Sequence, residues 1–255
     1  RMSGVSLSAG TIVDGLRRIE PLMVPIYEAI RQHQLQSRYF HADETRWKVF
    51  AEKAGKTGYS WWLWLFANED SVCLVLDPSR SRRVPQDHFA EDSAGVLNVD
   101  RYSAYKAMLQ VKGGRLALAF CWAHVRRDFV RVGKGYPQYK SWALGWLARI
   151  RELYRLNRER LLHTVGSPEY VAADNRLREQ IALMATALAS ELSDAKLHSA
   201  CRKVLTSLKE HWSGLTLFVD DPRIPMDNNR AERLIRNPAV GRKNYYGSGA
   251  EWSGR

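Results

Sequence analysis

Residues 39 to 50 read Y-F-H-A-D-E-T-R-W-K-V-F, and this stretch decides the fold. Aromatic and β-branched residues favour strands, and polar and apolar side chains alternate here as they do in a half-buried strand. Asp43 lies inside this strand, and Glu44 should point to the opposite face because successive side chains of a strand alternate. The sequence therefore predicts a strand that carries a carboxylate.

The segments that follow extend this strand into a sheet. Residues 59–66 and 72–76 are strand-like and come after short turns, which indicates an antiparallel meander. Helix and strand then alternate, with helices expected at 81–90, 102–110 and 122–132 and strands at 95–100 and 116–121. Right-handed crossovers would place the strand that ends in Asp100 parallel to that of Asp43 and near it. We therefore expect an α/β fold with a mixed five-stranded sheet that brings the two acids to one end.

Helical segments are expected outside this α/β core. Residues 11–36 carry apolar residues on one face until Pro21 and Pro25 interrupt the pattern, and we expect a helical lead-in that packs on the core. Apolar residues at three-and-four spacing then predict three helices, the third from Leu197 to Trp212, as an all-helical insertion. The expected segments are 1–38 (lead-in), 39–136 (core, first part), 137–221 (insertion) and 222–255 (core, last part).

The last segment contains M-D-N-N-R-A-E-R-L-I-R at residues 226–236, which places Glu232 among arginines. Asp227 to Asn229 suit a helix start, because their side-chain oxygens can accept hydrogen bonds from the first turn. Glu232 would then lie about one turn into the helix. Alternatively, this is an exposed capped helix in which Glu232 only offsets the arginines.

Asp43, Asp100 and Glu232 form the candidate catalytic constellation. Three converging carboxylates would repel one another without cations, so the arrangement suits divalent ions. Mg²⁺ or Mn²⁺ fits all-oxygen ligation, and two ions can activate a water or a 3′-hydroxyl and stabilise the leaving oxygen of a phosphodiester.

Charge points to a polyanionic partner. The net charge is +12 with a pI near 9.8, and residues 101–160 contain 14 Lys and Arg against 3 acidic residues. Candidate DNA contacts are His124, Arg126 and Arg127, for which an exposed helix face is the alternative, together with Arg230, Arg233, Arg236, Arg242 and Lys243.

Other features favour ordinary structural roles. Cys121 and His124 have the spacing of half a zinc site without a second half, which favours core packing of the cysteine. The tryptophans at 61, 62 and 64 are expected in the sheet core rather than stacked on bases. The longest apolar run, Trp61 to Ala67, is too short to span a bilayer, and no signal-peptide pattern opens the chain. We therefore expect a soluble, cytoplasmic protein without a membrane partner.

Four motifs carry a family resemblance: H-A-D-E-T around Asp43, V-D-R-Y-S-A-Y around Asp100, C-W-A-H-V-R-R-D-F around His124 and N-N-R-A-E-R-L-I-R-N-P around Glu232. In combination they resemble the IS66 family of bacterial insertion-sequence transposases over residues 10–255. The resemblance implies a ribonuclease-H-like core with a D, D, E triad at Asp43, Asp100 and Glu232. Arg101 stands where the family often has glycine.

The resemblance also implies Mg²⁺-dependent DNA cleavage and strand transfer at insertion-sequence ends, with those ends and target DNA as partners. A homo-oligomeric active complex associated with the bacterial nucleoid is expected. Family members usually carry further DNA-binding and zinc-binding segments upstream and a stretch downstream, so the chain is expected to be a catalytic-core fragment. Two alternatives remain: a nuclease or resolvase of the same fold without joining activity, and a non-catalytic basic DNA-binding module.

Overall fold

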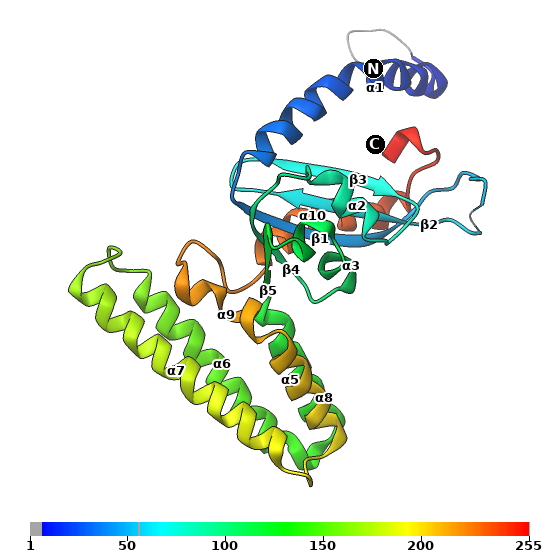
Figure 1. The fold of residues 1–255 in the computed structure, drawn as a ribbon. Helices are drawn as coiled ribbons and strands as arrows, with labels where there is room; N and C mark the ends of the chain where they lie inside the picture. Colours follow the sequence, from blue (N-terminus) through cyan, green and yellow to red (C-terminus); the bar gives the residue numbers. More distant parts are fainter. Residues whose placement is uncertain (1–6, 56, 255) are drawn as a thin grey trace. The chain divides into compact units, whose positions relative to one another are not determined.

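A computed structural model of the chain describes residues 7–55 and 57–254 (Figure 1). The chain divides into two compact units. The first unit contains Arg1–Leu97, Tyr102–Leu116 and Asn229–Arg255, and the second contains Asn98–Arg101 and Ala117–Asn228. The last segment of the chain therefore returns to the unit in which the chain begins.

A five-stranded mixed sheet in the order β3-β2-β1-β4-β5 confirms the expected α/β class. Its strands are β1 (Tyr39–Lys48), β2 (Ser60–Ala67), β3 (Val72–Asp77), β4 (Gly95–Val99) and β5 (Leu116–Phe120). The first three form the expected antiparallel meander, in which Asp43 pairs with Leu65 and Leu65 pairs with Leu74. β4 follows β1 in the sheet, as the crossover argument required.

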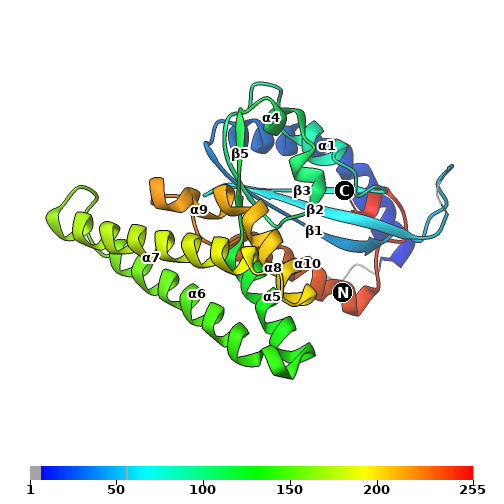
Figure 2. The same ribbon diagram turned by 60° about the horizontal axis from the view of Figure 1, so that its bottom comes forward.

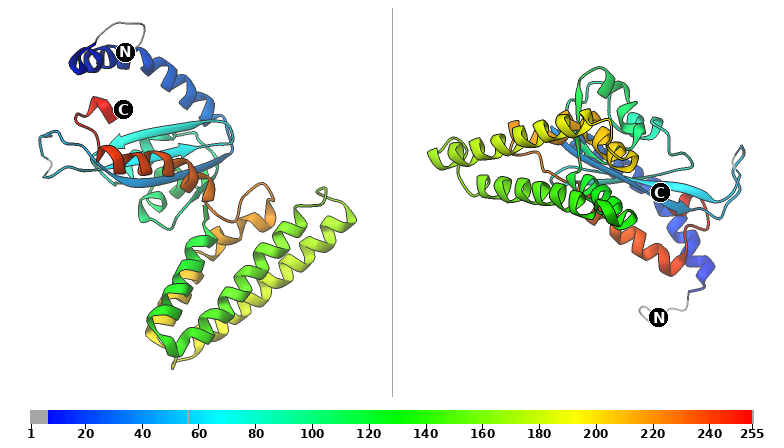
Figure 3. Two further views of the ribbon diagram at one scale, coloured as in Figure 1. Left: turned by 180° about the vertical axis from the view of Figure 1, so that it is seen from behind. Right: turned by 90° about the horizontal axis from the view of Figure 1, so that it is seen from below.

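Helices cover the two faces of the meander in the first unit. On one face, α10 (Asn229–Tyr245) lies across the strands, because its Ala231 and Ile235 pack on Leu65 and Ala67 (Figure 3, left). On the other face, the short helices α2 (Arg83–His88), α3 (Ser103–Lys106) and α4 (Leu109–Lys112) are found. There Phe66 stacks on His88, Trp64 meets Tyr105 edge-on, and Phe40 meets Phe89. Trp61 and Trp64 are fully buried, which confirms the expected core role for these two.

The lead-in is helical, as expected, but it packs differently from the expectation. Helix α1 (Ala9–Leu35) continues through Pro21 and Pro25. It was expected to pack on the core, but along the helix only Gln34, near its end, is buried. The prolines lie on the polar side of the helix, where the lost N–H bonds leave carbonyls close to water. The apolar side of α1 stays largely exposed.

The helix expected at 102–110 is two short helices, α3 and α4. Between them Met108 adopts an extended conformation (φ −61°, ψ 144°) and is fully buried. Burial of this side chain overrides the helical propensity of the segment.

The second unit contains the basic helix α5 and a helical hairpin. After α5 (Trp122–Gly135) and the 3-10 turn η1 (Pro137–Tyr139) come α6 (Lys140–Arg160) and α7 (Pro168–Ser193), which run side by side (Figure 2). α8 (Ser199–Glu210) and α9 (Trp212–Asp220) complete the unit.

The third expected helix, Leu197 to Trp212, corresponds to α8, and after a bend at His211 (φ −101°, ψ 5°) it is followed by α9, which was not expected. Beyond the bend, the backbone of Gly214 reaches β5, where a Cβ would lie only 2.4 Å from the Leu118 carbonyl oxygen. The bend brings α9 into this close contact.

None of the helices in the described part of the chain is both long and apolar enough to cross a membrane. The three cysteines are buried and free, which agrees with the absence of a disulfide framework in the sequence.

Candidate active site

Asp43 lies at the centre of the sheet, on the face that α10 covers. Residues directly opposite on antiparallel strands project to the same face. Asp43 is paired with Leu65, and Leu65 contacts α10, so the half-buried carboxylate lies on the α10 side of β1. Its Oδ1 accepts a hydrogen bond from the backbone N–H of Glu44 at 2.9 Å.

Glu232 is in the first turn of α10, as the sequence predicted, and is half-buried. Its neighbour Ala231 and the residue three positions on, Ile235, are the ones that pack on the sheet. Residues three apart share a helix face, so Glu232 lies at the border of the sheet-facing stripe. The first unit therefore carries two of the three predicted acids, Asp43 and Glu232, on the same side of its sheet.

The cations of α10 divide into anchored and exposed residues. Arg230 donates through Nε to the Asn68 carbonyl oxygen at 3.0 Å and also donates to that of Glu69, which fixes the start of α10 to the β2–β3 turn. Arg242 donates to Thr45 Oγ1 at 3.4 Å. Three others are exposed at helical spacing and form a cationic stripe of Arg233, Arg236 and Lys243.

Sequence reasoning gave no role to Glu44, yet its side chain is almost completely buried on the face opposite Asp43. It accepts hydrogen bonds from Arg80 Nε at 3.0 Å and from the Tyr105 hydroxyl at 2.6 Å. The Arg80 guanidinium is also stacked between Trp62 and Tyr102, 4.4 and 3.8 Å from the ring centroids. The Glu44–Arg80 ion pair and its aromatic neighbours hold the middle of β1 on the face opposite Asp43. In the sequence, only the alternation of side chains along the strand indicated that Glu44 lies on this face.

The second unit carries the third acid, Asp100, which is half-buried and directly follows β4. The residues on both sides of it are fixed. Asn98 donates to the Pro225 carbonyl oxygen at 3.1 Å. Arg101 donates to Ser207 Oγ at 2.9 Å and forms an ion pair with Asp128 of α5. The arginine thus ties the end of β4 to two helices of the same unit.

The start of α5 carries the remaining candidates. Arg126 and Arg127 are exposed and His124 is half-buried, whereas Val125 and Phe129 face the interior. Cys121 is fully buried, and its Sγ accepts a hydrogen bond from the Asn228 N–H at 3.3 Å. The Trp122 N–H donates to the Met226 carbonyl oxygen at 2.9 Å. These bonds fix the segment that leads into α10.

Tyr154 of α6 supports the same segment, because its hydroxyl donates to Asp227 Oδ2 at 3.4 Å. Burial, followed by the negative charge of Asp227, raises the pKa of Tyr154 well above its usual value. The phenol therefore stays protonated and remains a donor to Asp227.

Each of the three predicted acids has a side chain of the kind that binds hard divalent cations. Asp43, Asp100 and Glu232 offer only carboxylate oxygens, and each is half-buried rather than enclosed. Oxygen donors with room for water are what Mg²⁺ and Mn²⁺ require.

Comparison with known proteins identifies the family of the chain. The family model described as "Transposase IS66 family" matches residues 1–255, and the chain belongs to this family. Similar proteins from Sinorhizobium fredii (strain NBRC 101917 / NGR234) include Uncharacterized protein y4jD, 31% identical over 94% of this chain and 49% of that protein. Uncharacterized protein y4qI is 29% identical over 99% of this chain and 48% of that protein. The chain spans about half the length of these relatives, and no solved structure matches it.

Proposed function

We propose that this chain is the catalytic part of a DDE transposase, which cleaves DNA at insertion-sequence ends and joins the released 3′-hydroxyl to target DNA. Membership of the IS66 transposase family supports a DNA-processing enzyme. The observation that carries the finer proposal is the placement of Asp43 and Glu232 on one side of the sheet, with Asp100 at the end of the neighbouring strand. We also propose that the core is ribonuclease-H-like.

The acids would hold one or two Mg²⁺ or Mn²⁺ ions. Such ions, when bound, activate the attacking hydroxyl and stabilise the leaving oxygen of the phosphodiester. The protein residues position the carboxylates: Arg80 and Tyr105 hold β1 through Glu44, and Arg101 holds the end of β4 through Asp128 and Ser207. The cationic stripe and α5 would hold the phosphates of the DNA.

The test is a cleavage assay with the intact protein, a labelled duplex from the candidate insertion-sequence ends and Mg²⁺. Asp43→Asn, Asp100→Asn and Glu232→Gln should each reduce cleavage by several orders of magnitude, because charge stabilisation supplies most of phosphoryl-transfer catalysis. Folding, followed by circular dichroism, should be unchanged. Near-normal cleavage by any one variant would remove that residue from the triad.

The products distinguish this function from the alternatives. Joining of a labelled 3′-end to a target plasmid supports a transposase, whereas hydrolysis without joining supports a nuclease or resolvase. If the protein binds DNA but shows no metal-dependent cleavage, the result supports a non-catalytic DNA-binding module. Mg²⁺ and Mn²⁺ should support turnover, and Ca²⁺ should not, because its coordination is larger and looser. Anomalous density from soaked Mn²⁺ at Cys121 and His124, and not at the acids, would contradict the proposed metal site.

A further inference from the structure

Helix α1 is apolar around most of its circumference, although it belongs to a protein of high charge. Between Ala9 and Ile30 most of its polar residues lie on one arc with Pro21 and Pro25, namely Asp14, Arg17, Arg18 and Glu28, whereas Glu20 lies beside the apolar face. A helix that is apolar over such a wide arc is ordinarily buried. Here the apolar residues are exposed, and Leu22 reaches 68% exposure.

The exposed residues follow the spacing of a coiled-coil seam. Ile12, Leu16, Ile19, Met23, Ile26 and Ile30 alternate at intervals of four and three residues, and each is 40% to 56% exposed. This is the a/d pattern with which one helix packs against another. Both prolines of α1 lie outside the seam, so its six positions are uninterrupted. The repeat specifies a helix as the partner of this seam.

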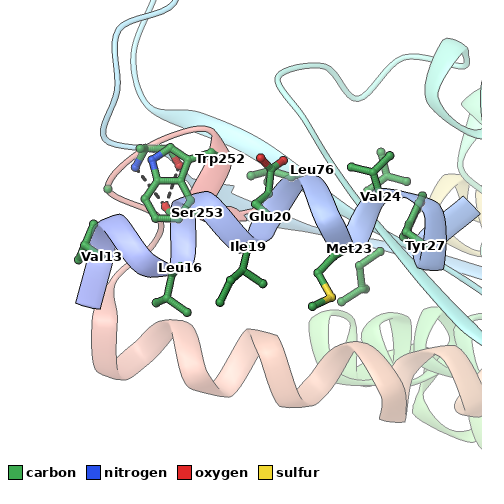
Figure 4. A pocket seen from close by; sticks show the side chains of 14 residues that line it. Val13, Leu16, Ile19, Glu20, Met23, Val24, Tyr27, Leu76, Trp252 and Ser253 are labelled. Atoms are coloured by element: carbon green, nitrogen blue, oxygen red, sulfur yellow. Dashed lines mark hydrogen bonds between the residues drawn. The ribbon is translucent and has the colours of Figure 1, made fainter. Parts of the chain in front are cut away.

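An apolar groove lies beside the seam, within the first unit (Figure 4). Its walls are α1 on one side and, on the other, β3 with the C-terminal residues around the 3-10 turn η2 (Trp252–Gly254). Leu16, Ile19 and Met23 project from one side of α1, and Leu76 and Trp252 also line the groove. The groove has a volume of about 1130 Å³. A helix about 10 Å across that rises 1.5 Å per residue would fill it with roughly ten residues, or nearly three turns.

The chain itself carries a helix that fits this groove, namely α1. An exposed apolar helix and an open apolar groove on one surface are self-complementary. Two copies related by a two-fold axis can therefore each place this helix in the groove of the other, which buries both apolar surfaces. We propose that α1 pairs with α1 of a second copy, each helix lying along the seam and in the groove of the other. The proposal does not rest on the proposed catalytic function, because it uses none of the catalytic residues.

Sedimentation of the purified protein over a range of micromolar concentrations tests this pairing. The wild type should be a dimer. Leu16→Ala with Met23→Ala should raise the dimer dissociation constant at least about tenfold, since central apolar contacts dominate interface energy. Alanine keeps α1 helical, which circular dichroism checks. The control, Arg17→Ala with Gln32→Ala on the polar arc, should leave the dimer intact.

Cross-linking locates the interface independently of stability. The native cysteines are buried, so an introduced Met23→Cys should give a disulfide-linked dimer on mild oxidation, whereas Gln32→Cys should not. The proposal would be overturned if the wild type were a monomer. It would also be overturned if the alanine substitutions in the seam left the dimer unchanged, or if cross-linking occurred at position 32 in place of position 23. In those cases a different partner, or a different surface, covers the groove.

Discussion

At the scale of single residues, His88 is a titratable side chain that folds in its neutral form. It stacks on Phe66 with ring centroids 3.9 Å apart, and its Nε2 is 2.8 Å from Gln34 Oε1. Burial, and then the charge of Arg31, lower the pKa of His88 from 6.5 to about 3. The end of α1 is held to α2 through this contact, which is therefore sensitive to acid.

The sign of the pH dependence follows from this lowered pKa. Because the folded pKa lies below the unfolded one, the unfolded chain binds the proton first as pH falls. The stabilisation that neutral His88 gives the folded state is complete above about pH 6.5. It is lost progressively toward pH 3, where the free energy of unfolding falls by up to about 1.4 kcal/mol per pH unit. His88→Gln should flatten this slope, measured as urea midpoints by tryptophan fluorescence between these pH values. An unchanged slope would show that His88 does not control it.

Arg160 is the second residue whose role only the structure shows. Its side chain is completely buried in the second unit and donates to Asp174 at 2.8 Å, to Asn157 at 2.7 Å and to two backbone carbonyls of α9. These bonds join α6, α7 and α9.

Arg160→Met should lower the free energy of unfolding by about 3 to 5 kcal/mol, because it leaves Asp174 and the carbonyls without their buried cation. Urea denaturation measures the loss. Arg155→Met is the matched control: this arginine of the same helix is exposed and pairs with Glu152 and Glu159, and its loss should cost under about 1 kcal/mol. If the two variants lost the same free energy of unfolding, the buried bonds of Arg160 would not be what stabilises the second unit.

At the scale of elements, the glycines of the second unit distinguish close packing from open surface. A Cβ on Gly214 of α9 would lie 2.4 Å from the Leu118 carbonyl oxygen and 2.5 Å from the Phe120 ring. Gly145 of α6 has nothing within 4 Å of the same position. Both glycines are helical, and the sequence does not separate them.

Gly214→Ala should therefore destabilise the protein by about 1 to 3 kcal/mol, because the backbone of β5 must move to admit the methyl group. Gly145→Ala should stabilise it by about 0.5 to 1 kcal/mol, since alanine restricts the unfolded chain and favours the helix. The two thermal midpoints, measured side by side, should shift in opposite directions. A rise in both would mean that α9 does not contact β5 as described.

Element boundaries were predictable wherever local pattern and tertiary packing agree. Alternation fixed β1 with Asp43 inside it, and the N-terminal signals at 227–229 fixed the start of α10. Helix α9 and the break at Met108 were missed, because both depend on contacts with distant segments. The exposure of the apolar side of α1 was missed for a similar reason: which side of a helix meets water is a tertiary property.

The candidate site, too, was predictable from local sequence pattern only in part. The sequence pointed to the three acids, and the structure places Asp43 and Glu232 on one side of the sheet. The sequence could not show that Glu44 and Arg101 form ion pairs, because their partners Arg80 and Asp128 are distant in sequence. Arg230 was expected to contact DNA, and in the structure its guanidinium donates a hydrogen bond to the backbone carbonyl oxygen of Asn68.

At the scale of the whole molecule, the charge of +12 overstates the cations available to DNA. Within residues 101–160, which hold most of the excess, Arg160 is buried and Arg101 and Arg155 have acidic partners. Arg126 and Arg127 on α5 are exposed, as is the cationic stripe of α10. Binding should therefore depend on these two surfaces rather than on net charge.

The last prediction measures that dependence by fluorescence anisotropy with end DNA and a scrambled duplex at several salt concentrations. Affinity should be weak, with a Kd on the order of 10⁻⁴ to 10⁻⁶ M at physiological salt, and should fall steeply as salt rises, because phosphate contacts release counterions. Arg126→Ala with Arg127→Ala should weaken binding equally on both duplexes and reduce the salt slope by roughly one per lost contact. Arg155→Ala, exposed but paired, should change little. A strong preference for end DNA that survives high salt would instead place base-specific recognition within these 255 residues.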